Sequence, residues 1–130
     1  MKRAVAFLLT IPPLILITSL MTYNRSSIYY NMQMPICDEL AKVVILVTSN
    51  APNIGLRQAQ RSAFSAQVLW SELRAVRIFL VAQHHNVSVM EQVMQEQDVL
   101  LGDFNESYRN LALKHMMGLS WAADNCHQDR

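Results

Sequence analysis

The chain has 130 residues, of which 52% are hydrophobic and 16% are charged, and its formal net charge is +1. A chain of this length holds one domain at most, and its few glycines and prolines predict a packed globule and exclude a disordered chain. Acidic and basic residues are dispersed along the sequence, so we expect no nucleic-acid partner.

An apolar segment near the N-terminus predicts insertion into a lipid bilayer. Lys2 and Arg3 precede residues 4–22, which carry no charge and are long enough to span about 30 Å of hydrocarbon as a helix. Positive charge before the segment favours a cytoplasmic tail at residues 1–3. No small-residue cleavage site follows, which favours a signal anchor over a cleaved signal peptide. Both alternatives send the remaining chain into the lumen.

Three N-x-S sequons agree with passage through the secretory pathway. Their asparagines are Asn24, Asn86 and Asn105, and we expect each to be a glycosylation site. For Asn105 the alternative is that it forms, with Ser107, only the turn and the cap before the last helix.

Residues 23–40 are polar and lack strong periodicity, so they are typical of a stem that leads to a globular part over residues 41–130. Cys37 lies near the end of this stem, and Cys126 is the second of two cysteines in the chain. In an oxidising lumen such a pair is expected to form a disulfide bond. The alternative is two buried free thiols.

Apolar runs alternate with helical patterns through the rest of the chain. Strands are predicted over residues 43–48, 77–83 and 99–101, the last closed by a turn at 102–104, and helices over 56–70, 87–97 and from an N-cap at Ser107 to Cys126. This alternation predicts an α/β fold with a parallel sheet, right-handed crossovers and helices on its faces. The expected inner faces are Leu56, Ala59, Ala63, Ala66 and Trp70 on the first helix, and Leu111, Ala112, His115, Met116, Leu119, Ala122, Ala123 and Cys126 on the last.

Polar residues near the strand ends are candidates for ligand binding. Arg57 and Arg61 are four residues apart, so both project from one side of the first helix, where a diphosphate would be favourable. The alternative is a solvated basic face. Asp103 would lie at the carboxyl end of a strand, where open α/β sheets place ligands. No dinucleotide, P-loop or zinc motif occurs, so those sites are not expected.

Two segments match patterns of a known family. Gly102-Asp103-Phe104, Ser107-Tyr108, Asn110-Leu111, Leu113-Lys114, Gly118-Leu119, Trp121 and Cys126 follow the order of GDIL..DF.DSY.NLTLKT..GL.W....C. Val47, Ser49, Pro52, Arg57, Ala59 and Arg61 follow V.S.P....R.AIR.TWG, with Gln60, Ala63, Phe64 and Ser65 in place of its isoleucine, threonine, tryptophan and glycine. In these segments the chain resembles the β-1,3-glycosyltransferase family, the galactosyl- and N-acetylglucosaminyltransferases of the secretory pathway.

The resemblance implies the N-terminal portion of a GT-A-like, Rossmann-like domain in a single-pass type II protein of the Golgi membrane. A whole member would transfer galactose or N-acetylglucosamine from a UDP-sugar donor to a hydroxyl of a glycan acceptor, in protein or lipid glycosylation. It implies Arg57, Arg61, Asp103 and Lys114 as donor-binding residues, and Tyr108 as the residue that holds the last helix against the sheet. For Lys114 the alternative is an exposed helical lysine. The resemblance also supports a bridge between the two cysteines.

The family places an aspartate-rich turn after the conserved cysteine, where carboxylates hold a divalent metal, usually Mn²⁺, against the donor diphosphate. A later acidic residue deprotonates the acceptor. In this sequence that turn would follow Arg130. We therefore assign no catalytic or metal-binding residue, and the expectation is an incomplete chain. The alternative is a non-catalytic, membrane-tethered lumenal protein that binds a nucleotide or forms an oligomer with a full-length glycosyltransferase.

Overall fold

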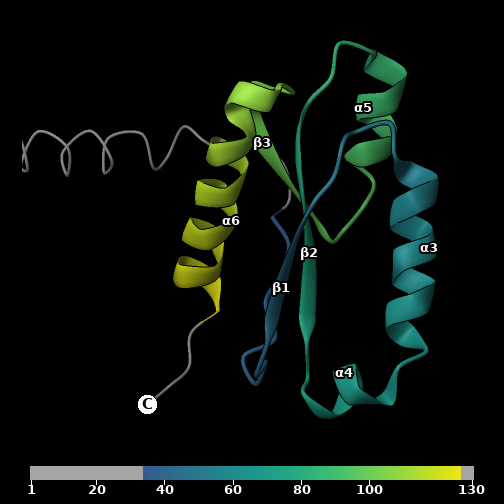
Figure 1. Ribbon diagram of the computed structural model, residues 1–130, viewed down its shortest axis with the longest axis vertical. Helices are drawn as coiled ribbons and strands as arrows, with labels where there is room; N and C mark the ends of the chain where they lie inside the picture. Colours follow the sequence, from purple (N-terminus) through teal and green to yellow (C-terminus); the bar gives the residue numbers. More distant parts are fainter. Residues whose placement is uncertain (1–33, 127–130) are drawn as a thin grey trace, which may run out of the picture.

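The computed structural model describes residues 34–126. Its elements are β1 (Val44–Thr48), α3 (Ile54–Ser65), α4 (Val68–Glu72), β2 (Val76–Gln83), α5 (Val87–Val93), β3 (Val99–Asn105), the 3-10 helix η1 (Tyr108–Asn110) and α6 (Leu111–Asn125). The strands form one parallel sheet in the order β1-β2-β3 (Figure 1). The predicted α/β class with a parallel sheet is confirmed.

The sheet separates two helical layers, with α6 on one side and α3 and α5 on the other (Figure 1). Successive side chains of a strand point to opposite faces, so Leu80 of β2 joins the core cluster on the α6 side and Phe79 joins the other cluster. Met117 and Trp121 of α6 complete the first cluster, and Val93 of α5 completes the second. The core is therefore a sheet buried on both faces at its central strand.

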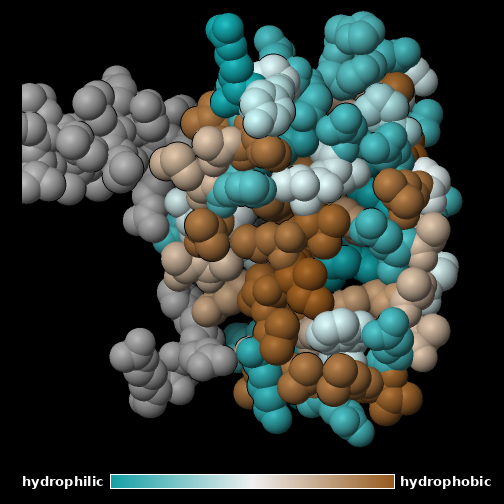
Figure 2. Space-filling model, in the orientation of Figure 1, coloured by the Kyte–Doolittle hydropathy of each residue, from teal (hydrophilic) through white to brown (hydrophobic). Residues whose placement is uncertain are grey.

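The edge strand β1 is less covered than its sequence predicts. Residues 44–47 are all apolar and all only half-buried, although a continuous apolar run is typical of a strand covered on both faces. Figure 2 shows hydrophobic residues gathered along the middle of this side of the molecule, over β1.

Helix α6 packs on the sheet with a face that only partly overlaps the predicted one, since Ala122 and Cys126 of the predicted face pack against the core. Its buried residues are Lys114, Met117, Gly118 and Trp121, whereas Leu119 is 65% exposed. Gly118 explains why this face of α6 contacts the sheet, because a Cβ atom at this position would lie 2.7 Å from Leu80 Cδ1. Only the glycine face lets the helix approach β2 this closely.

Replacing Gly118 by alanine is therefore expected to lower the free energy of unfolding by about 1 to 3 kcal/mol, since the new methyl group overpacks the contact with Leu80. Urea unfolding followed by circular dichroism measures the change. Gly55→Ala is the matched control, because nothing lies within 4 Å of its added Cβ atom, and alanine should favour the helix there. Equal effects of the two substitutions would contradict this packing argument.

The helix predicted over residues 56–70 is two helices, α3 and α4. Gln67 between them has extended dihedral angles, with φ −100° and ψ 115°, so the helical hydrogen bonds are interrupted there. The break lets the chain fold back until the Trp70 ring stacks on Phe64, with ring centroids 5.7 Å apart. The inner face of α3 also differs from the prediction, because Arg57 is buried and Leu56 is 58% exposed.

The next two elements differ from their predicted lengths. Helix α5 ends at Val93 and not at residue 97, because a turn at residues 94 and 95 follows it and brings the Glu96 carboxylate to the arginines of α3. Strand β3 continues past Leu101 to Asn105. The register of β3 against β2 shifts between Val81 and Gln83, which places Asp103 in an irregular part of the strand.

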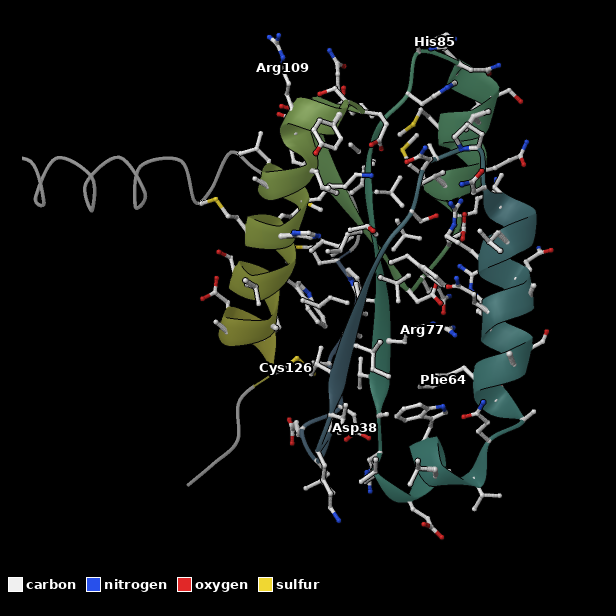
Figure 3. The ribbon with its side chains drawn as sticks, in the orientation of Figure 1. Asp38, Phe64, Arg77, His85, Arg109 and Cys126 are labelled. Atoms are coloured by element: carbon white, nitrogen blue, oxygen red, sulfur yellow. A yellow bond between two sulfur atoms is a disulfide. The ribbon has the colours of Figure 1, made fainter. Side chains whose placement is uncertain are left out.

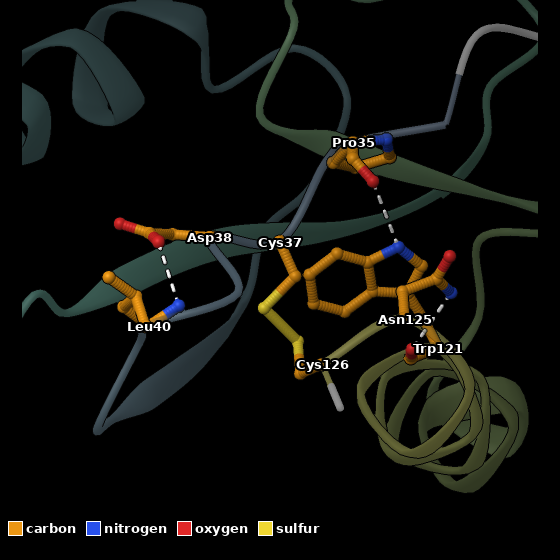
Figure 4. The surroundings of a disulfide bond; sticks show 7 residues. All are labelled: Pro35, Cys37, Asp38, Leu40, Trp121, Asn125 and Cys126. Carbon is orange, nitrogen blue, oxygen red and sulfur yellow. Dashed lines mark hydrogen bonds between the residues drawn. A yellow bond between two sulfur atoms is a disulfide. The ribbon is translucent and has the colours of Figure 1, made fainter. Parts of the chain in front are cut away.

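A disulfide bond joins Cys37 to Cys126, with their Cα atoms 5.3 Å apart (Figure 4). The separation lies within the usual range for a bridge. Nearby, Trp121 Nε1 donates a hydrogen bond to the Pro35 carbonyl oxygen at 3.2 Å. The segment that precedes β1 is thus attached to the end of α6 by one covalent bond and one hydrogen bond.

Within residues 34–126 no helix is long and apolar enough to cross a membrane. The predicted tail at 1–3, the anchor at 4–22, the first part of the stem and Asn24 all lie outside the described residues.

Candidate functional site

The loop after β1 takes its shape from a single buried arginine. Arg57 is 1% exposed, and its guanidinium donates to the Ser49 hydroxyl at 3.0 Å and to the carbonyl oxygens of Asn50 and Ala51 at 2.8 and 3.0 Å. Its other two donors go to the Glu96 carboxylate at 2.9 and 2.6 Å. All five N–H groups of the guanidinium are thereby occupied. Arg57 positions the loop and has no free donor.

Arg61 lies one turn further along α3 and belongs to the same ionic cluster. It donates to Asp98 at 2.9 and 2.6 Å, contacts Glu96, and its guanidinium lies over the Phe79 ring at 5.1 Å. Burial raises the pKa of Glu96, but hydrogen bonds from Arg57 and Arg61 outweigh it and hold the pKa below its ordinary value. The hydrogen bond to Asp98 raises the pKa of Arg61. Glu96 and Arg61 are therefore both ionised near neutral pH.

Lys114 ties the other side of the loop to α6. Its Nζ atom donates to the Ser49 carbonyl oxygen at 3.0 Å and lies 2.6 Å from Glu106 Oε2. Lys114 is 2% exposed, so it is not the exposed helical lysine of the alternative. Glu106 is placed directly after β3, where its backbone N–H donates to the Gln83 carbonyl oxygen at 3.0 Å.

Between Arg57 and Lys114 lies a hollow of about 350 Å³ at the carboxyl end of β1, which we call the β1 pocket. Its lining comes from the end of β1, the first turns of α3, the connection from β3 to η1, and α6. The lining residues are Val47, Thr48, Ser49, Asn50, Asn53, Leu56, Arg57, Gln60, Glu106, Ser107, Tyr108, Leu111 and Lys114. Tyr108 and Leu56 belong to the exposed rim, with exposures of 91% and 58%.

Tyr108 does not hold α6 against the sheet, contrary to the prediction, because so exposed a ring packs on little of the protein. The residue that caps this region is Ser107, whose hydroxyl accepts a hydrogen bond from the Asn110 backbone N–H at 3.2 Å. The cap begins η1, which runs directly into α6.

The β1 pocket carries no free positive charge within its lining. Glu96 neutralises Arg57, and Glu106 neutralises Lys114. What the lining presents to a ligand is hydroxyl, amide and backbone groups beside an aromatic ring. A neutral, planar, hydrogen-bonding group suits such a lining better than a diphosphate does.

The four predicted donor-binding residues fall into two pairs. Arg57 and Lys114 both line the β1 pocket, whereas Arg61 and Asp103 are absent from its lining. Asp103 is exposed near the carboxyl end of β3, where one carboxylate oxygen accepts a hydrogen bond from Gln83 Nε2 at 2.8 Å. Because the strands are parallel, Asp103 still lies at the same edge of the sheet as the pocket.

Three acidic residues of the site, Glu96, Asp98 and Glu106, were not predicted from the sequence. A signal for two of them was present in the first family pattern. When the chain is aligned to that pattern without a gap, Asp98 falls at the aspartate of GD and Asp103 falls at the aspartate of DF. Glu106 then falls at the aspartate of DSY. For Glu96 no motif gave a signal.

The two sequons within the described residues are exposed. Asn86 caps α5, where its Oδ1 atom accepts a hydrogen bond from the Val89 backbone N–H at 3.3 Å. The Asn105 carbonyl oxygen accepts one from Asn110 Nδ2 at 2.8 Å. Glycosylation at these positions stays a prediction.

A parallel sheet with helices on both faces places this chain in the class of open α/β domains, and its polar pocket lies at the carboxyl end of a strand, where such domains place ligands. Residues 56–130 match a family model described as Galactosyltransferase. The chain belongs to the galactosyltransferase family.

Several curated proteins are similar to this chain over part of their length. It is 30% identical over 88 residues to the proteins named beta-1,3-galactosyltransferase 1 of Mus musculus and Homo sapiens, covering 65% of this chain and 27% of each relative. It is 28% identical over 97 residues to beta-1,3-galactosyltransferase brn of Drosophila melanogaster, covering 73% of this chain and 30% of that protein. The matches therefore span less than a third of these relatives.

Proposed function

We propose that this chain is the donor-side part of a hexosyltransferase of the β-1,3-galactosyl- or N-acetylglucosaminyltransferase type. Such an enzyme would transfer a sugar from a UDP-sugar to a hydroxyl of a glycan acceptor, in the lumen of the Golgi and tethered by residues 4–22. The observation that supports this proposal most is a polar pocket at the carboxyl end of β1 in a chain of the galactosyltransferase family.

The β1 pocket would hold the uridine part of the donor. A volume of about 350 Å³ is in the range of small-ligand pockets and suits a nucleoside. Its neutral lining offers amide and hydroxyl groups to the edge of a base, and the exposed Tyr108 ring offers a stacking surface. The diphosphate and the sugar would then lie outside the pocket, toward the edge of the sheet that carries Asp103.

The predicted donor-side residues would act mainly by positioning. Arg57 and Lys114 hold opposite sides of the Ser49 segment, and Arg61 braces Asp98 and Glu96. Through these contacts the backbone of the loop would be fixed before the nucleotide binds, which lowers the entropic cost of binding.

The divalent metal that the family suggests does not fit the described residues. No group of three His, Cys, Asp or Glu side chains within 34–126 could hold a metal ion, and the pocket carboxylate of Glu106 is paired with Lys114. We therefore assign no step of the reaction to a metal held by this part of the chain.

Replacing Tyr108 by alanine is expected to weaken uridine and UMP binding by about tenfold, because a stacking surface for the base is removed. Isothermal titration with uridine, UMP and UDP measures the affinities. The stability should not change, since the side chain is 91% exposed. Arg109→Ala is the matched control, since Arg109 is an exposed neighbour outside the pocket lining.

Two results would contradict this assignment. One is equal affinity of the wild type and Tyr108→Ala for uridine. The other is competition by inorganic pyrophosphate that is as strong as competition by uridine, which would place phosphate groups in the pocket.

A second function, nucleotide binding without catalysis, is favoured by one observation. Among the residues that line the β1 pocket the single carboxylate is Glu106, and its pairing with Lys114 leaves no free base there. An assay with UDP-galactose and UDP-N-acetylglucosamine, with and without Mn²⁺, separates the two functions. Binding without transfer or hydrolysis supports the second function, and turnover of either donor rules it out.

A further inference from the structure

A second hollow lies at the opposite edge of the sheet, at the amino ends of the strands. It has a volume of about 480 Å³, and its lining includes Asp38, Phe64, Gln67, Trp70, Ser71 and Arg74. These residues come from the segment before β1, the end of α3, helix α4 and the connection to β2. We call this hollow the amino-end groove. The β1 pocket does not include it, and the family patterns cover only Phe64 and Ser65 of its lining.

The aromatic wall of the amino-end groove is the outermost layer of a stack that reaches into the core. The Arg77 guanidinium lies between two rings, 4.8 Å from the centroid of the buried Phe79 and 4.7 Å from that of Phe64. Arg77 and Phe64 are labelled in Figure 3. Phe64 in turn stacks on Trp70, with ring centroids 5.7 Å apart and planes inclined by 7°. Trp70 is therefore held in a fixed orientation before any ligand arrives.

Arg77 is also held by an ion pair, because its Nη2 atom lies 3.6 Å from Asp98 Oδ2. Its Nη1 atom donates to the Gln60 carbonyl oxygen at 2.7 Å, and its Nε atom is buried without a hydrogen-bond partner within the described chain. Leaving a buried donor unpaired is costly. The ion pair with Asp98 and the contacts of the guanidinium with two rings offset that cost, and the ring contacts hold the aromatic stack in place.

The rim of the amino-end groove is polar. Arg74 Nε and Nη2 donate to Asp38 Oδ2 at 3.1 and 2.8 Å, which leaves the Nη1 donors of Arg74 free within the described residues. Arg74 has a left-handed backbone, with φ 46°, a conformation that costs a side-chain-bearing residue about 1 kcal/mol. Exposed Gln67 and Ser71 add an amide and a hydroxyl that make no side-chain hydrogen bond in the described part of the chain.

From this combination we infer that the amino-end groove binds a pyranose ring of a glycan. A pyranose has an apolar C–H face, which packs on an aromatic ring, and hydroxyl groups around its edge, which need donors and acceptors. The Trp70 ring with the surrounding guanidinium, amide and hydroxyl groups supplies both. An anion is a poorer fit because Asp38 neutralises Arg74, and a purely apolar ligand would leave the polar rim unpaired.

The amino-end groove is independent of the β1 pocket. The two lie at opposite ends of the strands and share no lining residue. Sugar binding in the groove would thus be a contact with a glycan away from the nucleotide, and its failure would leave the proposed donor site untouched.

The test uses the full 130-residue chain with its disulfide oxidised, titrated with methyl β-galactoside, methyl N-acetyl-β-glucosaminide and lactose in a sugar-free buffer. Tryptophan fluorescence and saturation-transfer NMR report binding. The chain has two tryptophans, and Trp121 is fully buried, so a change caused by a surface ligand reports on Trp70. We expect saturable binding, with saturation transferred to protons on one ring face. Sorbitol, which has hydroxyl groups but no ring, should not bind.

Trp70→Ala is expected to weaken sugar binding by about tenfold, and Trp70→Phe to restore part of it. Gln67→Ala, an exposed change that leaves the stack intact, should weaken binding by about threefold with unchanged stability. This second variant keeps the test valid if Trp70→Ala unfolds. Tyr108→Ala should leave sugar binding unchanged.

Three results would overturn the proposal. These are no binding of any of the three sugars at tens of millimolar, binding that survives both Trp70→Ala and Gln67→Ala, and binding that is lost in Tyr108→Ala while Trp70→Ala retains it. The last result would assign the sugar to the β1 pocket.

Discussion

Replacing Arg57 by alanine is expected to lower the free energy of unfolding by about 3 to 5 kcal/mol, because it removes one partner of a buried ion pair. The substitution also leaves the Ser49 hydroxyl and the Asn50 and Ala51 carbonyl oxygens without their donor. Urea unfolding followed by circular dichroism measures the loss. Uridine binding should weaken as well, since the loop that Arg57 shapes lines the β1 pocket.

Arg57→Lys and Arg61→Ala are the matched controls. Lysine keeps the charge but has three donors in place of five, so it should recover only part of the stability. Arg61 is 28% exposed, so solvent compensates for its removal and a smaller loss is expected. Wild-type stability that survives Arg57→Ala would show that the loop keeps its shape without the arginine.

The pH dependence of stability provides a second readout of the same ion pair. The pKa of Glu96 is lowered in the folded state, so its contribution is present above the unfolded pKa and is lost as pH falls through the folded pKa. Removing Arg57 takes away one of the two hydrogen-bonding arginines, which raises the folded pKa toward its ordinary value. Acid unfolding of Arg57→Ala should therefore begin at higher pH.

Removing the disulfide with Cys37→Ala and Cys126→Ala together is expected to lower the free energy of unfolding by about 4 to 5 kcal/mol. The bridge closes a loop with a sequence separation of 89, and so long a loop restricts the unfolded chain strongly. Urea unfolding of the double variant and of the wild type under oxidising conditions measures the difference. A loss of this size is a large part of the total stability of a small domain.

A reducing agent is the control for the disulfide prediction. It should bring the unfolding midpoint of the wild type close to that of the double variant, and it should leave the double variant unchanged. Coincident midpoints of the oxidised wild type and the double variant would show that the bridge does not contribute to stability.

The faces of the helices are where the predictions from sequence were wrong. Leu56 and Leu119 were expected to lie inside and are exposed, whereas Arg57 and Lys114 are buried. Hydrophobic periodicity assigns charged side chains to the outside, and it fails where each buried cation has a buried or half-buried acid beside it. Those acids, Glu96 and Glu106, lie 39 and 8 residues away along the chain, and only the fold brings Glu96 to α3.

The location of the candidate site in the fold was predictable from the sequence, but the side chains that line it were not. The order of strands and helices was enough to put ligands at the carboxyl edge of a parallel sheet, and the β1 pocket lies there. Which side chains meet in it depends on local geometry. The shifted register of β3 leaves Asp103 exposed, while Glu106 reaches Lys114.

By itself, the sequence of this protein determined the fold class, the alternation of strands and helices along the chain, and the family to which it belongs. These follow from local information, because apolar periodicity and short motifs report on backbone conformation within a few residues. Only the tertiary structure decided that Arg57 and Lys114 are buried and that Tyr108 is exposed. The same holds for the contact of the Arg77 guanidinium with the Phe64 ring. The reason is that the burial of a charge or a ring depends on partners distant in sequence, and no local pattern specifies where those partners lie.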